Sequence, residues 1–253
     1  MKIAVSGKGG VGKTTVSANL AKLFRNEGFK VYAVDADPDS SLGLALGIDE
    51  KALAKIKPII EMRELISEEA GDGAIYKLNP IVDKVIDKYS LEFGGIRFLK
   101  MGGIKRGGSS CYCRENTFLK ALVNSLILDT KEIVIMDMGA GIEHLTRGTS
   151  SGVDLMVVVT EPGKSSVQTA RIVENLAKEL GIKEIKFIAN KVRSIKEKLF
   201  IEENFKTEEL LGVLGYDEKL AELSMGYGQN SLEIDNSELK TLLFKIVNRA
   251  KIS

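Results

Sequence analysis

The chain has 253 residues, of which 44% are hydrophobic and 28% are charged, and this composition is ordinary for a soluble globular protein with a sizeable core. Lysine and arginine (36) nearly balance aspartate and glutamate (35), so the basic excess typical of nucleic-acid-binding proteins is missing. No apolar run approaches the roughly 20 residues that a membrane-spanning helix needs. We therefore expect a cytoplasmic protein that binds neither nucleic acid nor membrane.

Six short apolar runs rich in isoleucine and valine predict buried parallel strands. In chain order they are 2–5, 31–34, 96–99, 133–136, 155–159 and 185–189. Segments with helical spacing are 14–26, 115–128, 165–180 and 238–250. Because strands that alternate with helices form βαβ crossovers, the pattern predicts an α/β fold. Its doubly wound, mostly parallel sheet should carry helices on both faces.

No linker rich in proline, glycine or serine divides the chain, so we expect a single domain over residues 1–253. Residues 49–91 have a weaker pattern, which predicts mainly helix with one short extended piece at 75–78. We interpret the region around 49–114 as an elaboration of that domain.

The first glycine-rich turn, from Gly7 to Thr14, reads GKGGVGKT and fits the phosphate-loop pattern G-x-x-x-x-G-K-[ST]. Its glycines allow backbone N–H groups to close around phosphate oxygens at the positive end of the following helix. We expect Lys13 to reach the β- and γ-phosphates and the Thr14 hydroxyl to bind Mg²⁺. The turn therefore predicts a nucleoside triphosphate site.

The same glycines also fit the dinucleotide pattern G-x-G-x-x-G, and Asp35 stands where a ribose-binding acid would fall. A dinucleotide site, however, has no need of a lysine and a hydroxyl at Lys13 and Thr14. We therefore favour the phosphate loop and keep the dinucleotide site as the alternative.

A second lysine, Lys8, gives the loop the form KGGVGKT. This form resembles the deviant Walker A loop of the P-loop ATPases that include the nitrogenase iron protein, the arsenite-pump ATPase and the division-site and partition ATPases. The resemblance implies an ATPase that forms a homodimer, binds ATP or ADP with Mg²⁺, and uses Lys8 and Lys13 in catalysis. In that family the extra lysine reaches the partner's nucleotide, where it stabilises charge on the transferred group. A solvated surface lysine is the alternative for Lys8.

Acids at predicted strand ends extend the resemblance. The run from Asp35 to Ser40 resembles the first switch, which implies that Asp37 orients the attacking water, with Asp39 as second choice. Asp137 ends an apolar strand in the Walker B manner, and we expect it to hold Mg²⁺ through water. The glycines after it resemble the second switch. Without the preceding phosphate loop, each aspartate would be interpreted as a turn or helix-cap residue.

The resemblance also implies that the amide of Asn190 contacts the adenine edge, although a turn asparagine is the alternative. Relatives usually have a proline two residues before the aspartate at Asp217, and this chain has Gly215 there. The implied nucleotide ligands are Gly9, Gly10, Val11, Gly12, Lys13, Thr14, Thr15, Asp137 and Asn190.

Cys111 and Cys113 are the only cysteines, and they supply two soft ligands. Zinc in a closed tetrahedral site takes four ligands, and square-planar nickel can also take four. Two chains related by a dimer axis would bring together four thiolates. A redox-active dithiol and inert packing are the alternatives.

The strings CYCREN (111–116) and DMGAGIEHLTRG (137–148) resemble the nickel-handling ATPases that mature carbon monoxide dehydrogenase, often called CooC proteins. This resemblance implies a metallochaperone that dimerises with ATP and Ni²⁺ (or Zn²⁺) and delivers nickel to carbon monoxide dehydrogenase or acetyl-CoA synthase. A regulatory or positioning ATPase and an iron–sulfur ATPase are the alternatives. The sequence leaves open which metal and which client enzyme are used.

For two further features, His144 and the segment 238–250, we favour a structural interpretation over a functional one. His144, the sole histidine, could relay switch motion or contact metal, but a helix-start histidine bonded to backbone is the simpler interpretation. The basic amphipathic segment 238–250 resembles the membrane anchor of the division-site relatives, yet we expect a packed terminal helix with a solvated edge.

Overall fold

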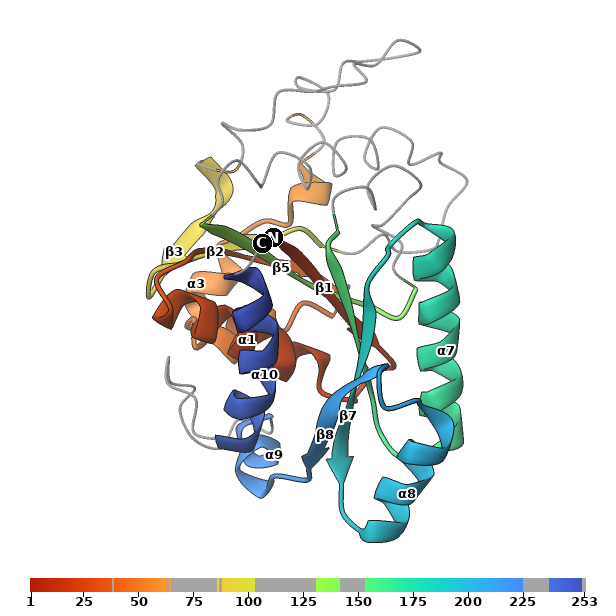
Figure 1. Ribbon diagram of the computed structural model, residues 1–253. Helices are drawn as coiled ribbons and strands as arrows, with labels where there is room; N and C mark the ends of the chain where they lie inside the picture. The colour runs from red at the N-terminus through yellow and green to blue at the C-terminus, as the bar shows by residue number, and fades with distance from the viewer. Residues whose placement is uncertain are drawn as a thin grey trace.

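One sheet organises the part of the chain that the computed structural model describes, which is residues 1–37, 39–62, 64, 86, 88–102, 131–141, 153–224 and 237–251. Its strand order is β3-β4-β2-β5-β1-β6-β7-β8, and only the edge pair β3–β4 is antiparallel. The strands are β1 (Lys2–Gly7), β2 (Lys30–Ala36), β3 (Leu91–Phe93), β4 (Ile96–Lys100), β5 (Glu132–Met138), β6 (Leu155–Thr160), β7 (Ile185–Val192) and β8 (Leu210–Gly215). The predicted α/β fold with a mostly parallel sheet is confirmed (Figure 1).

Helices cover both faces of this sheet. In chain order they are α1 (Lys13–Asn26), α2 (Leu42–Leu46), α3 (Glu50–Ala54), the short 3-10 helix η1 (Ile59–Glu61), α7 (Lys164–Glu179), α8 (Ile195–Asn204), α9 (Glu218–Ser224) and α10 (Ser237–Ala250). Buried side chains of α1 and α10 belong to one core, and those of α7 and α8 belong to the other. Figure 1 shows α1 and α10 side by side, with α7 and α8 across the sheet from them.

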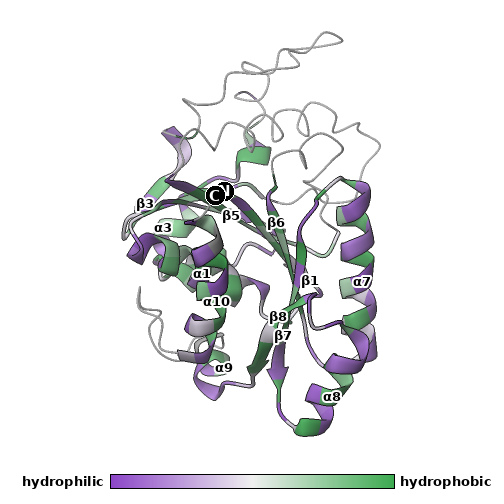
Figure 2. Ribbon diagram, viewed as in Figure 1, coloured by the Kyte–Doolittle hydropathy of each residue, from purple (hydrophilic) through white to green (hydrophobic). Residues whose placement is uncertain are grey.

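The central strand β1 illustrates why both faces need cover. Ile3 and Val5 join the core under α1 and α10, whereas Ala4 points into the core under α7. Successive side chains of a strand point to opposite faces. All six residues of β1 are buried, because both faces of the sheet are covered at this strand. Hydrophobic residues accordingly follow the strands, while α1, α7 and α10 carry both hydrophobic and hydrophilic residues (Figure 2).

Each of the six strands predicted from apolar runs is present, with ends within three residues of the prediction, and the helices predicted at 14–26, 165–180 and 238–250 are present to within one residue at each end. The sequence analysis missed β3, β8, α2, α8 and α9. Gly212 and Gly215 interrupt the apolar pattern of β8, and in α8 the large side chains of Ile195 and Leu199 are exposed. The predicted helix 115–128 and the extended piece 75–78 lie outside the described residues.

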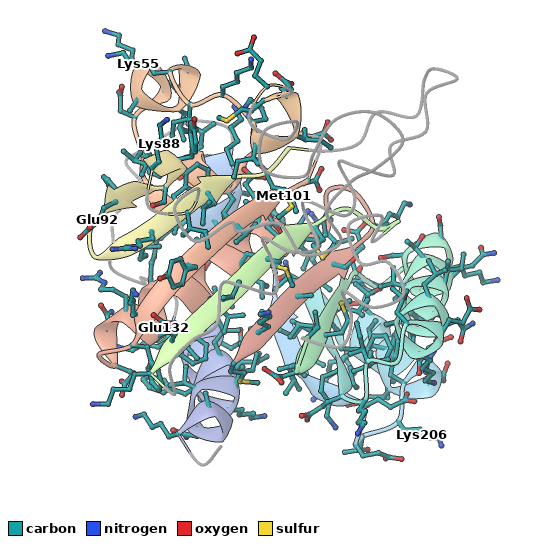
Figure 3. The ribbon with its side chains drawn as sticks, turned by 90° about the horizontal axis from the view of Figure 1, so that it is seen from above. Lys55, Lys88, Glu92, Met101, Glu132 and Lys206 are labelled. Carbon is teal, nitrogen blue, oxygen red and sulfur yellow. The ribbon has the colours of Figure 1, made fainter. Side chains whose placement is uncertain are left out.

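The two edge strands of the sheet are β3 and β8. Glu92 on β3 and Lys206, just before β8, lie at opposite sides of the molecule when it is seen from above (Figure 3). At the β8 edge, α10 buries five apolar residues: Leu239, Leu242, Leu243, Ile246 and Val247. The apolar face of this segment is therefore packed, as expected for a terminal helix. Among the described residues, no helix has the length and apolar character needed to cross a bilayer.

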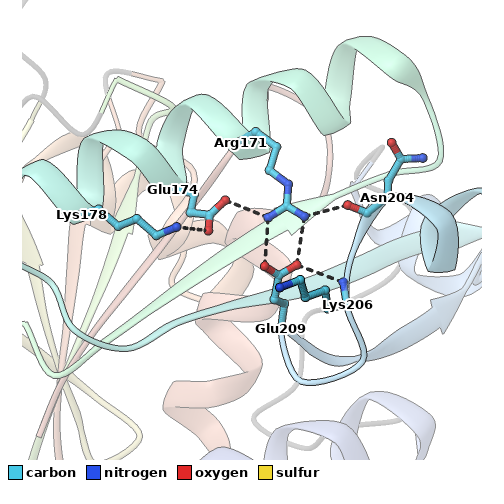
Figure 4. A network of polar contacts seen from close by, with 6 residues as sticks. All are labelled: Arg171, Glu174, Lys178, Asn204, Lys206 and Glu209. Atoms are coloured by element: carbon cyan, nitrogen blue, oxygen red, sulfur yellow. Dashed lines mark hydrogen bonds and ion pairs between the residues drawn. The ribbon is translucent and has the colours of Figure 1, made fainter.

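A polar cluster around Arg171 joins α7 to the β8 side of the sheet (Figure 4). The Arg171 guanidinium donates to Glu174 at 2.8 Å, to Glu209 at 2.9 Å and to the backbone carbonyl of Asn204 at 2.7 Å. The same group lies over the rings of Phe187 and Phe205, 5.0 and 4.6 Å from their centroids. One side chain thus ties together α7, β7, the end of α8 and the approach to β8.

Candidate nucleotide site

The loop between β1 and α1 lies at the carboxyl ends of the central strands, beside β6 and the end of β7. Two of its glycines are required by the surroundings. Gly7 has φ 147°, and a Cβ there would clash with the Val159 carbonyl oxygen. Gly12 has φ 99° at the start of α1, and a Cβ there would clash with the Asn190 amide nitrogen. Neighbouring strands therefore approach this loop too closely for side chains at these positions.

The two lysines of the loop have different surroundings. Lys13 is buried, and its ammonium donates to the Lys8 carbonyl at 3.3 Å and lies 3.6 Å from Asp37 Oδ2. The Lys8 ammonium instead extends to α7, where it donates to Ser165 Oγ at 3.1 Å in an exposed contact. The structure therefore places Lys13 beside Asp37, whereas the ammonium of Lys8 is directed toward α7.

Hydroxyl groups on the first turns of α1 hold the acid at the end of β5. Thr14 donates to one oxygen of Asp137 at 2.7 Å, and Ser17 donates to the other at 3.1 Å. Thr14 also lies 3.2 Å from the Ser41 hydroxyl. Asp137 has no exposed surface, and this burial raises its pKa to about 6. The arrangement fixes both oxygens of the Walker B acid beside the phosphate loop.

A second acid, Asp35, pairs with Asp137 across β2 and β5 in register. Its Oδ2 accepts from Ser40 Oγ at 3.0 Å and from the Leu42 N–H at 3.1 Å, while its Oδ1 has no hydrogen-bond partner among the described residues. Burial, followed by the nearby charge of Asp137, raises the pKa of Asp35 to about 7. Only 1% exposed, Asp35 is not placed to bind a ribose hydroxyl.

The donor set at this point fits magnesium. Thr14, Asp37 and Asp137 offer hard oxygen atoms, which Mg²⁺ prefers. Among the described residues, no group of three or more histidine, cysteine, aspartate or glutamate side chains could hold a metal ion. Magnesium commonly takes its remaining ligands from water and substrate phosphates, so a complete protein cage is not needed.

Partly or fully exposed residues form the opposite wall of the site. Asn190 donates to the Val11 carbonyl at 2.9 Å, and the Lys191 ammonium donates to the Gly10 carbonyl at 2.5 Å. The Arg193 guanidinium lies 4.3 Å from the centroid of the Tyr216 ring. These groups and the phosphate loop line one cavity of about 890 Å³, a volume suited to a small-molecule ligand.

Most of the predicted ligands meet in this cavity. Its lining includes Lys8, Gly9, Gly10, Gly12, Lys13, Thr14, Thr15, Asp37, Asp39 and Asn190. The Val11 side chain is buried, and its backbone carbonyl accepts a hydrogen bond from Asn190. Cys111, Cys113 and His144 lie outside the described residues.

The sequence analysis did not single out Ser17, Ser41 or Lys191. The position of Ser17, one helical turn after Thr14, was a usable signal, because residues three apart share a helix face. Lys191 had no comparable signal, since its placement depends on the backbone of β7.

Residues 2–227 match the family model described as the CobQ/CobB/MinD/ParA nucleotide binding domain. The chain belongs to this family. A CobQ/CobB/MinD/ParA-type domain accounts for the deviant phosphate loop, and it identifies the chain as a P-loop ATPase, as predicted. The dinucleotide alternative is set aside, in agreement with the burial of Asp35.

Individual relatives of this CobQ/CobB/MinD/ParA-family ATPase agree with that assignment. An uncharacterized ATP-binding protein of Methanocaldococcus jannaschii is 44% identical over 228 residues, which are 87% of each chain. The carbon monoxide dehydrogenase accessory protein CooC of Rhodospirillum rubrum is 43% identical over 221 residues, 86% of this chain and 84% of that protein. The predicted resemblance to CooC proteins is therefore confirmed.

Among solved structures, the septum site-determining protein MinD of Pyrococcus horikoshii, complexed with Mg-ADP, has a TM-score of 0.67. Its sequence is 20% identical, and the match covers 100% of this chain and 98% of that one. At this identity the likeness supports the fold alone.

Proposed function

We propose that this ATPase is an accessory protein for carbon monoxide dehydrogenase, which dimerises on binding ATP and metal and delivers nickel to the client enzyme. The observation that carries the proposal is the 43% identity to the accessory protein CooC over most of both chains. The adjacent thiols of Cys111 and Cys113 support a metal cargo, because thiolates are suitable ligands for nickel and zinc. Acetyl-CoA synthase is the second possible client.

The nucleotide site would work through its phosphate side. Lys13 would neutralise charge on the β- and γ-phosphates, and Thr14 and Asp137 would hold Mg²⁺, which would supply Lewis-acid polarisation of the transferred phosphoryl group. Asp37, 3.6 Å from Lys13, orients the water that attacks the γ-phosphorus, and ADP leaves. Asn190 contacts the adenine. These roles agree with the way the side chains gather around one cavity.

Dimerisation would complete two half-sites together. Lys8 is partly buried, but its ammonium makes an exposed contact with Ser165 that it could exchange for the nucleotide of a facing subunit. Cys111 and Cys113 from both subunits would provide four thiolates to Ni²⁺ or Zn²⁺. Linkage makes the effects reciprocal: if ATP favours the dimer that binds metal, metal favours the same dimer.

The test substitutes Cys111→Ser and Cys113→Ser together and measures metal per protein by elemental analysis, and mass by light scattering, with and without ATP. We expect the wild-type dimer to hold one nickel or zinc ion and the double variant to lose it while still binding ATP. The two single variants serve as matched controls and should bind metal weakly. Unchanged stoichiometric metal in the double variant would contradict the thiolate site.

The client is tested separately by adding nickel-loaded protein and ATP to nickel-free carbon monoxide dehydrogenase or acetyl-CoA synthase. We expect faster activation of one client than free nickel gives at the same concentration.

A wild-type protein that stays monomeric with saturating ATP and nickel would refute the dimer mechanism. Nucleotide-dependent binding to a surface or polymer, unaffected by the cysteine substitutions, would instead indicate a positioning ATPase.

A further inference from the structure

Strand β7 contains a bulge beside the phosphate loop. Ala189 pairs with Val213 and Val192 pairs with Gly215, so two residues of β7, Asn190 and Lys191, stand opposite one residue of β8. Lys191 has φ 61°, in the left-handed region that residues other than glycine rarely adopt. In a regular strand, two successive side chains would point to opposite faces. Here both reach the same loop.

The two side chains bind successive carbonyl groups of that loop. Asn190 donates to the Val11 carbonyl at 2.9 Å, and the Lys191 ammonium donates to the Gly10 carbonyl at 2.5 Å. In a planar trans peptide, the C=O and N–H groups point in opposite directions. Holding these two carbonyls toward β7 therefore turns the N–H groups of Val11 and Gly12 the other way, where they are available to phosphate oxygens.

The backbone conformation of Lys191 supports a functional role for its contact with the Gly10 carbonyl. A left-handed φ at a lysine is strained, and such strain persists where surrounding contacts fix it, often at ligand-binding sites. Among the described residues, the ammonium also lies 4.0 Å from Glu161 Oε2, and both side chains are more than one-third exposed. An ion pair of that length in water contributes little. The bond to the Gly10 carbonyl is the closer and better-placed contact.

We propose that Lys191 is a positioning residue for the phosphate loop: its ammonium holds the Gly10 carbonyl outward and so presents the Val11 N–H to the bound phosphates. The inference rests on the phosphate-binding part of the proposed function and is independent of the cysteine site. It requires Lys191 to affect ligands that carry phosphates, and to leave the binding of adenosine unchanged.

Two variants separate the ammonium from the backbone strain. Lys191→Met keeps the length of the side chain but removes the donor, and Lys191→Gly removes the donor and also relieves the left-handed φ. We expect both variants to bind ADP and ATP about tenfold more weakly in the presence of Mg²⁺, as lost charged hydrogen bonds commonly cause. Calorimetric titration measures these affinities, with adenosine as the ligand that lacks phosphate.

Thermal unfolding of the ligand-free variants distinguishes positioning from a general structural role. We expect Lys191→Gly to be more stable than Lys191→Met, although both lose the same affinity for ADP. Lys186→Met is the matched control, because Lys186 lies on the same strand and donates to the backbone carbonyl of Glu208 at 2.7 Å, away from the loop. Its nucleotide affinities should equal those of the wild type.

Three results would overturn the inference. They are wild-type affinity for ADP and ATP in both Lys191 variants, a loss of adenosine affinity equal to the loss for ADP, and affinities that follow stability between the two variants. A wild-type protein that binds no ATP would overturn the nucleotide site itself and this inference with it. Normal ATP binding with no effect of Lys191 would overturn the inference alone.

Discussion

The phosphate side of the nucleotide cavity and the side formed after β6 and at the end of β7, called here the β7 side, hold their polar groups in different ways. On the phosphate side, Lys13, Asp35 and Asp137 are buried at the ends of central strands or at the start of α1. On the β7 side, Lys191 and Glu161 have side chains that are 39% and 37% exposed. Electrostatic interactions are stronger in the buried environment, where an unpaired charge also costs more.

The two sides are therefore prepared for ligand by different means. Burial raises the pKa values of Asp35 and Asp137, so the phosphate side of the ligand-free protein holds acids that a cation would stabilise. The geometry of the β7 side depends instead on a bulge and on hydrogen bonds near water. We expect substitutions on the two sides to separate chemistry, stability and pH dependence.

The most severe loss of activity is expected for Lys8, which lies on the phosphate loop but is less buried than Lys13. Lys8→Met should lower ATP turnover by about a thousandfold, because a cation supplied in trans contributes on that scale to phosphoryl transfer. Its melting temperature should match that of the wild type, since the substitution removes one exposed contact, to Ser165. Steady-state phosphate release and light scattering measure turnover and dimerisation.

The control for Lys8 is Lys198→Met, which removes an exposed lysine 3.8 Å from Glu202 on α8. This variant should retain turnover. If Lys8→Met also dimerises with ATP and hydrolyses it at the wild-type rate, then Lys8 has no role in trans, and the contrast with buried Lys13 has no functional meaning.

The next effect tests how Arg171 ties α7 to β7 and to the approach to β8. Arg171→Met should lower the free energy of unfolding by about 2–3 kcal/mol, because it leaves Glu174 and Glu209 without their shared charged donor. Urea unfolding measures this loss. Lys178→Met is the control, since Lys178 pairs with the same Glu174 but its side chain is 59% exposed, and it should change stability by less than about 0.5 kcal/mol. Equal losses in the two variants would show that the Arg171 cluster has no special weight.

The smallest effect concerns pH and Asp35. Its pKa in the folded chain, about 7, lies above the ordinary value of 3.8, so the folded state binds more protons than the unfolded state between these values. Stability of the ligand-free protein should therefore be highest below pH 4 with respect to this group and fall as pH rises through 7. The pKa shift alone corresponds to about 4 kcal/mol at high pH. The weakened hydrogen bonds from Ser40 and the Leu42 N–H offset much of this gain. Asp35→Asn should therefore remove this fall and raise stability at pH 7.5 by about 1 kcal/mol.

Melting temperatures from pH 4.5 to 8 without magnesium or nucleotide test this expectation. A steeper fall in stability for Asp35→Asn than for the wild type would show that the carboxylate is stabilising when ionised.

The parts of the fold and site that follow from local pattern were predictable. Asp35 and Asp137 end apolar runs after a phosphate loop, so their place at adjacent strand ends could be derived from sequence. The paired contacts of Asn190 and Lys191 could not, because they depend on a register shift and a left-handed φ that composition does not specify. Arg171 resembles any polar residue of a surface helix until the rings of Phe187 and Phe205 are seen beside it.

The strand order has one further consequence for how this cavity could evolve. The neighbours β1 and β6 lead into helices on opposite faces of the sheet, α1 on one and α7 on the other. Chain crossovers that diverge in this way open a crevice at the carboxyl ends of the two strands. The strand order therefore creates the nucleotide-binding crevice. Other surfaces of the protein can change in relatives while this crevice is kept.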